Sequence, residues 1–148
     1  MSFASNRLLK EHSKIKSEPI EGFTFLESEN LFVVKGYLHG VNDTPYENGK
    51  FLLQMTFDES YPVKAPSIKF LVPMYHPNIY RDGKICIDIL QNEWTPAQNV
   101  RTILYSIRSL LMDPNPSSPA NREAAELYNK DRTAYENKVR DCIKNNKK

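Results

Sequence analysis

Apolar positions recur at helical spacing near the start of the chain. One face of residues 2–16 carries Leu8, Leu9, His12 and Ile15. Intervals of three and four residues are typical of an amphipathic helix. We therefore expect a helix over residues 2–16, with Ser5 as a candidate N-cap, ended by Pro19 and Gly22.

The next part of the chain changes to short segments rich in aromatic and β-branched residues, which is typical of strands. These segments are residues 23–26, 31–38, 51–57 and 67–71. In the third, Phe51, Leu53, Met55 and Phe57 alternate with Leu52, Gln54 and Thr56. The connections are short and rich in turn residues such as Asn48-Gly49, which favours an antiparallel meander of four strands over a parallel sheet.

A second helical pattern is the strongest in the chain. It comprises Val100, Ile103, Leu104, Ile107, Leu110 and Leu111, and Asp113-Pro114 ends it. Two further helices are predicted around residues 124–128 and 135–143, and either Ser118 or Asn121 could cap the first of them. The pattern predicts an α+β fold with an N-terminal helix, a four-stranded meander, an irregular segment, a central helix and two C-terminal helices.

Composition limits the possibilities. At 148 residues, the chain is expected to form one domain over residues 1–148, and to work as a monomer. Its net charge is only +2 and its Lys and Arg residues are scattered, so neither nucleic acid nor membrane is an expected partner. Two cysteines are too few for a disulfide framework, and no apolar run reaches the roughly 20 residues of a membrane span. We expect a cytoplasmic or nuclear protein.

Candidate chemistry centres on Cys86, which lies between two isoleucines but close to Lys84 and Asp88. A lone cysteine in an apolar setting is most often a small hydrophobic residue, and we interpret Cys142 in that way. The charged neighbours of Cys86 instead favour a thiol whose reactivity is tuned. Asn78, in the same irregular stretch, offers an amide donor that could stabilise an oxyanion.

Other chemistries fit the sequence less well. His76 could act as the base of a cysteine hydrolase, but Pro77 fixes the turn after it, and the sequence shows no orienting third partner. We favour a structural histidine. The three histidines and two cysteines show no paired metal-ligand spacing, so neither a metal nor another cofactor is expected.

The motifs around the cysteine resemble those of ubiquitin-conjugating enzymes. The sequence HPN at residues 76–78 is followed by ICIDIL and then by WTP. The segments TPYENGKF, SYPVKAP and SLLMDPNPSSPAN also follow in the order of that family. The resemblance runs nearly from end to end and implies the α+β ubiquitin-conjugating fold.

The resemblance implies a role for Cys86: it accepts ubiquitin from an activating enzyme as a thioester and yields it to a substrate lysine. Asn78 would stabilise the oxyanion, and Asp88 would orient or desolvate the lysine, unless it is simply a solvated loop carboxylate. The residues implied to line the site are Tyr75, His76, Pro77, Asn115 and Ser118.

Ser118 departs from the family pattern, in which many members carry an acidic residue at this position. A hydroxyl there suggests that discharge to lysine depends on a ligase or an acidic substrate surface. Phosphorylation of the Ser118-Pro119 site would restore the negative charge. The simpler interpretation, a helix cap, is favoured.

The resemblance also implies partner surfaces. A RING-type ubiquitin ligase would contact Arg7, Lys10, Pro62, Val63, Pro96 and Ala97. The donor ubiquitin would fold against Thr102, Tyr105 and Ser109 of the central helix. Each of these residues also has an ordinary explanation as a turn residue or a solvated helix position.

The connector PNPSSPAN and the stretch DILQNEW most resemble the compact branch that monoubiquitinates histones and acts in DNA-damage tolerance and protein degradation. Three alternatives stay open: a non-catalytic scaffold of the same fold, an enzyme for another ubiquitin-like modifier, and a thiol hydrolase. The presence of both Cys86 and Asn78 argues against the scaffold.

Overall fold

The computed structural model describes residues 2–146. Four strands form one antiparallel sheet in the order β1-β2-β3-β4. Their bounds are Phe23–Leu26, Val33–His39, Lys50–Thr56 and Ser67–Phe70. The predicted meander is therefore confirmed. Strand β2 begins two residues later than predicted because Asn30 forms a turn, its side chain accepting from the Phe32 N–H.

One face of the sheet is buried and the other is more open. In β3, the side chains of Phe51, Leu53 and Met55 are buried while those between them are not, as the alternation predicted. The register pairs Leu38 of β2 with Phe51 and places both on the buried face. This alternation is what an antiparallel sheet with a single covered face requires.

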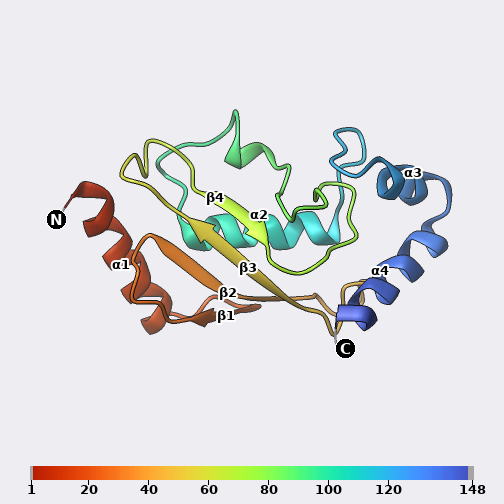
Figure 1. Ribbon diagram of the computed structural model, residues 1–148, viewed down its shortest axis with the longest axis horizontal. Helices are drawn as coiled ribbons and strands as arrows, with labels where there is room; N and C mark the ends of the chain where they lie inside the picture. The colour runs from red at the N-terminus through yellow and green to blue at the C-terminus, as the bar shows by residue number, and fades with distance from the viewer. Residues whose placement is uncertain (1, 147–148) are drawn as a thin grey trace.

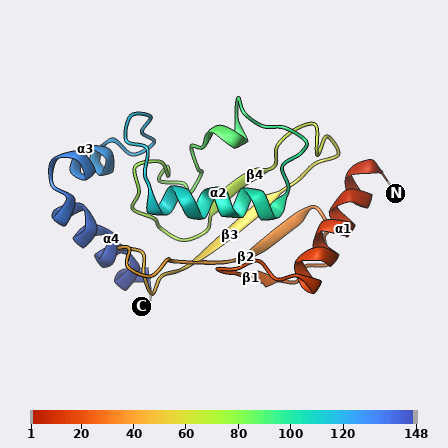
Figure 2. The same ribbon diagram turned by 180° about the vertical axis from the view of Figure 1, so that it is seen from behind.

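Helix α2, Val100–Met112, covers the buried face of the sheet (Figures 1 and 2). Its buried residues are Val100, Ile103, Leu104, Ile107 and Leu111. A capping box begins it, in which Asn99 and Thr102 exchange side-chain and backbone hydrogen bonds. The predicted central helix is confirmed, although Leu110 lies at the edge of the apolar face and is only half-buried.

The remaining helices lie at the two ends of the sheet. Helix α1, Phe3–Ser17, is at one end, and α3, Arg122–Lys130, with α4, Arg132–Asn146, is at the other (Figure 1). The prediction that Ser5 caps the first helix was wrong. Ser2 is the cap, since its hydroxyl accepts from the Ser5 N–H at 3.1 Å, which leaves Ser5 inside the helix.

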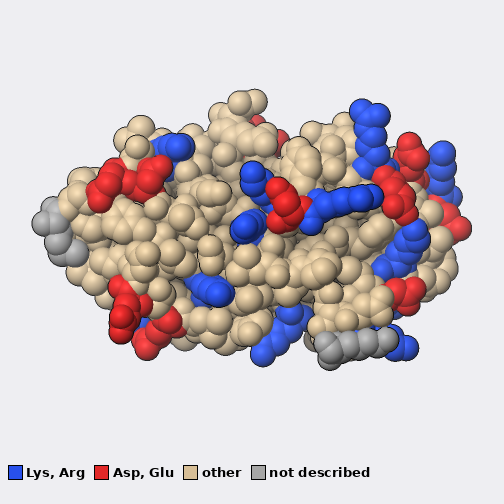
Figure 3. All heavy atoms as spheres, in the orientation of Figure 1, with Lys and Arg blue, Asp and Glu red and all other residues tan. Residues whose placement is uncertain are grey.

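The irregular segment that connects β4 to α2 lies alongside α2 in both views (Figures 1 and 2). It contains the short 3-10 helix η1, Asp88–Leu90. Positive and negative side chains are interspersed on the face shown in Figure 3, most densely at the end formed by α3 and α4. Among residues 2–146, none of the helices is long and apolar enough to cross a membrane.

Candidate active site

The site is built around the turn formed by His76, Pro77 and Asn78. The His76 ring is fully buried at 0% exposure. Its Nε2 lies 2.8 Å from the Leu110 carbonyl oxygen, and its Nδ1 accepts from the Asn78 backbone N–H at 2.9 Å. Because a carbonyl can only accept, the proton is on Nε2 and the ring is neutral. Burial lowers the pKa of His76 to about 4.

These contacts make His76 a structural residue that joins the turn to α2. Both of its ring nitrogens are engaged, so it has no free nitrogen with which to take a proton from a thiol. The interpretation favoured from the sequence is supported by this geometry. His76 lies beneath the site rather than on its surface.

Asn78 binds the connector between α2 and α3. Its amide nitrogen donates to the carbonyl oxygens of Asn115, at 2.8 Å, and Ser118, at 3.1 Å. Its Oδ1 accepts from the Asn115 backbone N–H at 2.8 Å. The Pro77 carbonyl accepts two more hydrogen bonds from the connector, donated by the N–H groups of Ala120 and Asn121. The turn and the connector are therefore held together as one unit.

Cys86 follows a tight loop that folds back onto this turn. Its backbone N–H donates to the Asn78 carbonyl at 2.8 Å, and Ile79 pairs with Ile85 in an antiparallel bridge. The loop turns at Gly83, whose φ of +93° favours glycine, and a Cβ there would lie 2.0 Å from the Phe70 carbonyl oxygen. Gly83 thus permits close packing of this loop on β4.

The two cysteines lie in different environments. Cys86 is half-buried beside the turn described above. Cys142 is also half-buried, on α4, where its thiol donates to the Pro73 carbonyl at 3.5 Å and burial raises its pKa. A thiol with a raised pKa is less often the reactive thiolate. Only Cys86 lies next to the HPN turn.

Three of the predicted site residues, Asp88, Asn115 and Ser118, are exposed. Within residues 2–146, the Asp88 carboxylate forms no ion pair, so its charge is available to an incoming group.

The prediction that Ser118 caps the next helix was wrong. Asn121 caps α3 by accepting from the Ala124 N–H at 3.1 Å, and Ser118 contributes only its backbone carbonyl to the hydrogen bonds above.

Arg7, of the predicted ligase surface, belongs to a network between α1 and the loops beside it. Its guanidinium pairs with Glu11 at 3.2 Å and donates to the Gln98 carbonyl at 2.6 Å. The same group lies 5.0 Å from the centre of the Tyr61 ring. Arg7 therefore has structural contacts in addition to any role in binding a partner, while Lys10 is exposed.

The two loops of this surface meet at Trp94, whose indole N–H donates to the Pro62 carbonyl at 2.9 Å. Val63 is 80% exposed, and Pro96 and Ala97 are exposed as well. Pro62, in contrast, is buried, so its ring offers little surface to a partner.

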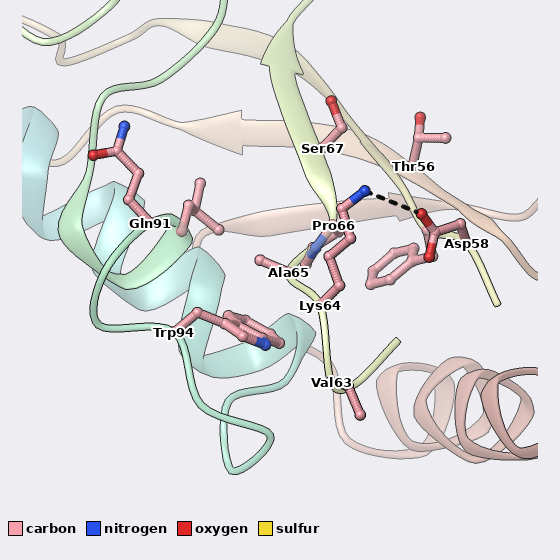
Figure 4. A pocket seen from close by; sticks show the side chains of 11 residues that line it. Thr56, Asp58, Val63, Lys64, Ala65, Pro66, Ser67, Gln91 and Trp94 are labelled. Carbon is pink, nitrogen blue, oxygen red and sulfur yellow. Dashed lines mark ion pairs between the residues drawn. The ribbon is translucent and has the colours of Figure 1, made fainter. Parts of the chain in front are cut away.

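A hollow of about 580 Å³ lies beside these loops. One wall carries Lys64 and Asp58, which form an ion pair at 3.5 Å, and the opposite wall carries Gln91 and Trp94 (Figure 4). Cys86 is not among its lining residues. The hollow therefore belongs to the loop surface rather than to the site around the thiol.

The three residues of α2 that were predicted to contact the donor ubiquitin differ in their exposure. Tyr105 and Ser109 are exposed and lie one turn apart, so they share a face of the helix. Thr102 is half-buried, and its hydroxyl is engaged in the capping box with Asn99. Tyr105, at 42% exposure, is the large exposed side chain among these three predicted residues.

Two residues that are distant from the site in the sequence but hydrogen-bonded behind it in the fold were not predicted. Tyr46 donates to the Tyr75 carbonyl, and the hydroxyls of Tyr135 and Tyr46 are hydrogen-bonded to each other. Tyr46 lies in the segment TPYENGKF and Tyr135 in a predicted helix, but neither pattern indicates that the two side chains meet. Within the described residues, His, Cys, Asp and Glu side chains nowhere gather in a group of three that could hold a metal ion.

Comparison with known proteins agrees with this arrangement. The sequence model of the family described as ubiquitin-conjugating enzyme matches residues 7–143. The chain is 45% identical over 141 residues to ubiquitin-conjugating enzyme E2 2 of Mycosarcoma maydis, covering 95% of this chain and 76% of that protein. It is 44% identical over 138 residues to ubiquitin-conjugating enzyme E2 1 of Caenorhabditis elegans, covering 93% and 72%.

A third relative, ubiquitin-conjugating enzyme E2 2 of Candida albicans, is 43% identical over 143 residues, covering 96% of this chain and 80% of that protein. The matched region includes the HPN turn, both cysteines and the connector bound by Asn78. The chain therefore belongs to the ubiquitin-conjugating enzyme family.

Proposed function

We propose that Cys86 carries ubiquitin as a thioester and transfers it to the amine of a substrate lysine. As a member of its family, the chain is a transferase that acts through a thioester with ubiquitin, an activating enzyme and a ligase. In the first step, the Cys86 thiol loses its proton, its sulfur bonds to the carbonyl carbon of the ubiquitin C-terminus, and the activating enzyme's sulfur leaves as a thiolate that takes up a proton. In the second step, the lysine nitrogen bonds to that carbon, loses a proton, and the Cys86 thiolate leaves.

One observation carries the assignment to Cys86: its backbone N–H is bonded at 2.8 Å to the Asn78 carbonyl. This bond places a half-buried thiol against the HPN turn, within the region matched by the family. His76 cannot act as a base toward this thiol, because both nitrogens of its ring are engaged. An amine can attack a thioester without an activated water, so this set of residues favours transfer over hydrolysis.

Asn78 is the proposed oxyanion donor, and its hydrogen bonds set a condition on that role. Both N–H groups of its amide donate to carbonyls, so one must be released when the oxyanion forms. The bond to Ser118 is the longer, at 3.1 Å, and is the one we propose is exchanged. Asp88, exposed and free of ion pairs within residues 2–146, is proposed to orient the lysine.

We further propose that a RING-type ligase binds across the two loops joined by Trp94, with Val63, Pro96 and Ala97 as its exposed contacts. Tyr105 and Ser109 are the proposed contacts of the donor ubiquitin.

The proposed working form is a monomer with one domain over residues 1–148, acting in the cytoplasm or nucleus. Core residues contributed by all four α-helices and the sheet form one cluster, which supports the single domain. The proposed substrate class, histones and other proteins of DNA-damage tolerance or degradation, rests on the resemblance of the segments PNPSSPAN and DILQNEW to that branch of the family.

A discharge assay tests the transfer step. The charged enzyme is isolated, the activating enzyme is stopped by removing ATP, and free lysine is added. Loss of the thioester should depend on lysine concentration and should yield ubiquitin joined to lysine by an amide bond, in wild type and in Cys142→Ala alike. Release of free ubiquitin at a rate independent of lysine would contradict transfer and support hydrolysis.

A further inference from the structure

Three tyrosines from distant parts of the chain meet behind the HPN turn. The Tyr46 hydroxyl donates to the Tyr75 backbone carbonyl at 2.6 Å, and the hydroxyls of Tyr46 and Tyr135 lie 2.9 Å apart. The Tyr75 carbonyl belongs to the peptide bond that enters His76. The hydrogen-bonded chain therefore ends on the backbone of the turn itself.

The direction of this chain follows from the number of protons. A tyrosine hydroxyl has one proton, and that of Tyr46 is donated to the Tyr75 carbonyl. Tyr135 must therefore donate to the Tyr46 oxygen. Tyr46 and Tyr135 are buried, at 2% and 1% exposure, and burial raises the pKa of both hydroxyls, so each stays protonated as a donor. Successive bonds of this kind strengthen one another in a buried setting.

The fold directs Tyr46 inward by a tight connection between β2 and β3. Asp43 and Asn48 have positive φ angles of 65° and 68°, and the Gly49 N–H donates to the Tyr46 carbonyl at 2.9 Å. Gly40 allows the close approach, because a Cβ there would lie 1.7 Å from the Tyr46 carbonyl oxygen. The connection holds the backbone of Tyr46 closely in place, which limits the positions open to its hydroxyl.

Aromatic contacts fix the other members. The Tyr135 ring lies 5.8 Å from the Tyr75 ring and packs edge-on against Tyr128 at 5.1 Å. The Tyr46 ring lies 6.0 Å from both Phe51 and His76. Rings packed on several sides have few alternative orientations.

The HPN turn is thus held from three directions. His76 joins it to α2, and Pro77 with Asn78 joins it to the connector. The tyrosine chain joins it to α4, an element that carries no other part of the site. The first two anchors involve residues of the turn, whereas the third is supplied entirely by side chains outside it.

We propose that Tyr46 and Tyr135 are positioning residues for ubiquitin transfer, which orient the peptide bond between Tyr75 and His76 and through it the HPN turn. The inference rests on the proposed transfer from Cys86. It makes α4 part of the machinery that sets the rate of discharge.

The test compares Tyr46→Phe, Tyr135→Phe and Tyr128→Phe. Each removes one hydroxyl and keeps the ring. Tyr128 is the matched control, because it contacts Tyr135 but its hydroxyl makes no hydrogen bond within residues 2–146. For each variant, we would measure the unfolding midpoint, the rate of charging, and the kcat and KM for discharge to free lysine in a single turnover. Backbone NMR shifts of His76, Asn78 and Cys86 would report the position of the turn in the uncharged enzyme.

We expect kcat for discharge to fall about two- to tenfold in Tyr46→Phe and Tyr135→Phe, because each variant loses one buried hydrogen bond. The KM for lysine and the rate of charging should stay unchanged. The double variant should be no slower than Tyr46→Phe alone, because Tyr135 acts through Tyr46. The NMR shifts should move in both variants and stay in place in Tyr128→Phe.

Discharge at the wild-type rate in both folded variants, with unmoved shifts, would overturn the inference. So would equal losses in charging, kcat and stability, since these would indicate a general structural role. Failure of the wild type to form any thioester has a separate meaning: it would reject the proposed function, and the inference with it.

Discussion

Asn78 and Asn115 exchange two hydrogen bonds of 2.8 Å, one in each direction. The Asn78 amide donates to the Asn115 carbonyl, and the Asn115 backbone N–H donates to the Asn78 Oδ1. Because the Asn78 side chain is 1% exposed, no water replaces either bond. The geometry of the turn beside Cys86 therefore depends on an amide side chain at this position.

Replacing Asn78 by Asp should destabilise the fold. The shape is retained, but both N–H donors are lost and a carboxylate then faces the Asn115 and Ser118 carbonyls. We expect a loss of about 3 kcal/mol in the free energy of unfolding, measured by urea denaturation. Asn115→Ala is the control, since only the backbone of Asn115 bonds to Asn78, and it should stay within about 0.5 kcal/mol of wild type. Similar losses in the two variants would contradict this account.

Stability should fall in acid because of His76. Its pKa is about 4 in the fold and ordinarily 6.5, so below pH 6.5 the unfolded chain takes up a proton that the folded chain does not. The contribution of His76 to the free energy of unfolding is about 3 kcal/mol. It is complete above pH 6.5 and is lost as the pH falls from 6.5 to about 4. His12 is also buried, and burial lowers its pKa, so it adds in the same direction.

Urea denaturation of wild type and His76→Gln at several pH values between 7.5 and 4 would measure this contribution. The slope of stability against pH should be smaller in the variant, whatever its stability at neutral pH. Parallel curves for the two proteins would show that His76 does not titrate as described.

Ser118 should limit discharge to free lysine through its lack of charge. The side chain is exposed and only its backbone carbonyl is bonded to Asn78, so Ser118→Asp and Ser118→Ala should fold like wild type. We expect Ser118→Asp to discharge several times faster, on the order of threefold to tenfold, and Ser118→Ala to match wild type. Equal rates for all three would remove the idea that this position acts as a gate.

Val63 should contribute to ligase binding without contributing to the fold. Val63 is 80% exposed, so changing it to Asp should alter the free energy of unfolding little. Losing an apolar contact that a ligase buries should instead weaken ligase binding by more than about 1 kcal/mol, which is fivefold or more. Discharge should be measured with and without a RING-type ligase domain that stimulates the wild type. Only the stimulated rate should fall, and an equal fall without the ligase would place the effect elsewhere.

The sequence allowed prediction of those features that have a local period or a local motif. The alternation of Phe51, Leu53 and Met55 predicted β3, and helical spacing predicted the buried face of α2, because both patterns follow directly from backbone geometry. The ends of the strands and the helix caps were predicted less accurately. Single side chains such as Ser2 and Asn30 decide them, and several neighbours offer the same chemistry.

Contacts between distant segments could not be predicted in this way. Tyr46 and Tyr135 are 89 residues apart, and Asn78 and Asn115 are 37 apart. Their pairing depends on how the turn, α4 and the connector pack, which no local period records. The burial of Pro62 has the same origin, since it depends on the loop of Trp94, with which it shares a hydrogen bond.

Intact-protein mass spectrometry after charging with ubiquitin, its activating enzyme and ATP would show whether Cys86 is the residue that carries ubiquitin. We expect one ubiquitin adduct on wild type and on Cys142→Ala, removed by added thiol in both. Folded Cys86→Ala should carry no adduct, and Cys86→Ser should carry an ester that resists thiol. An adduct that persists in Cys86→Ala, or that disappears in Cys142→Ala, would contradict the assignment to Cys86.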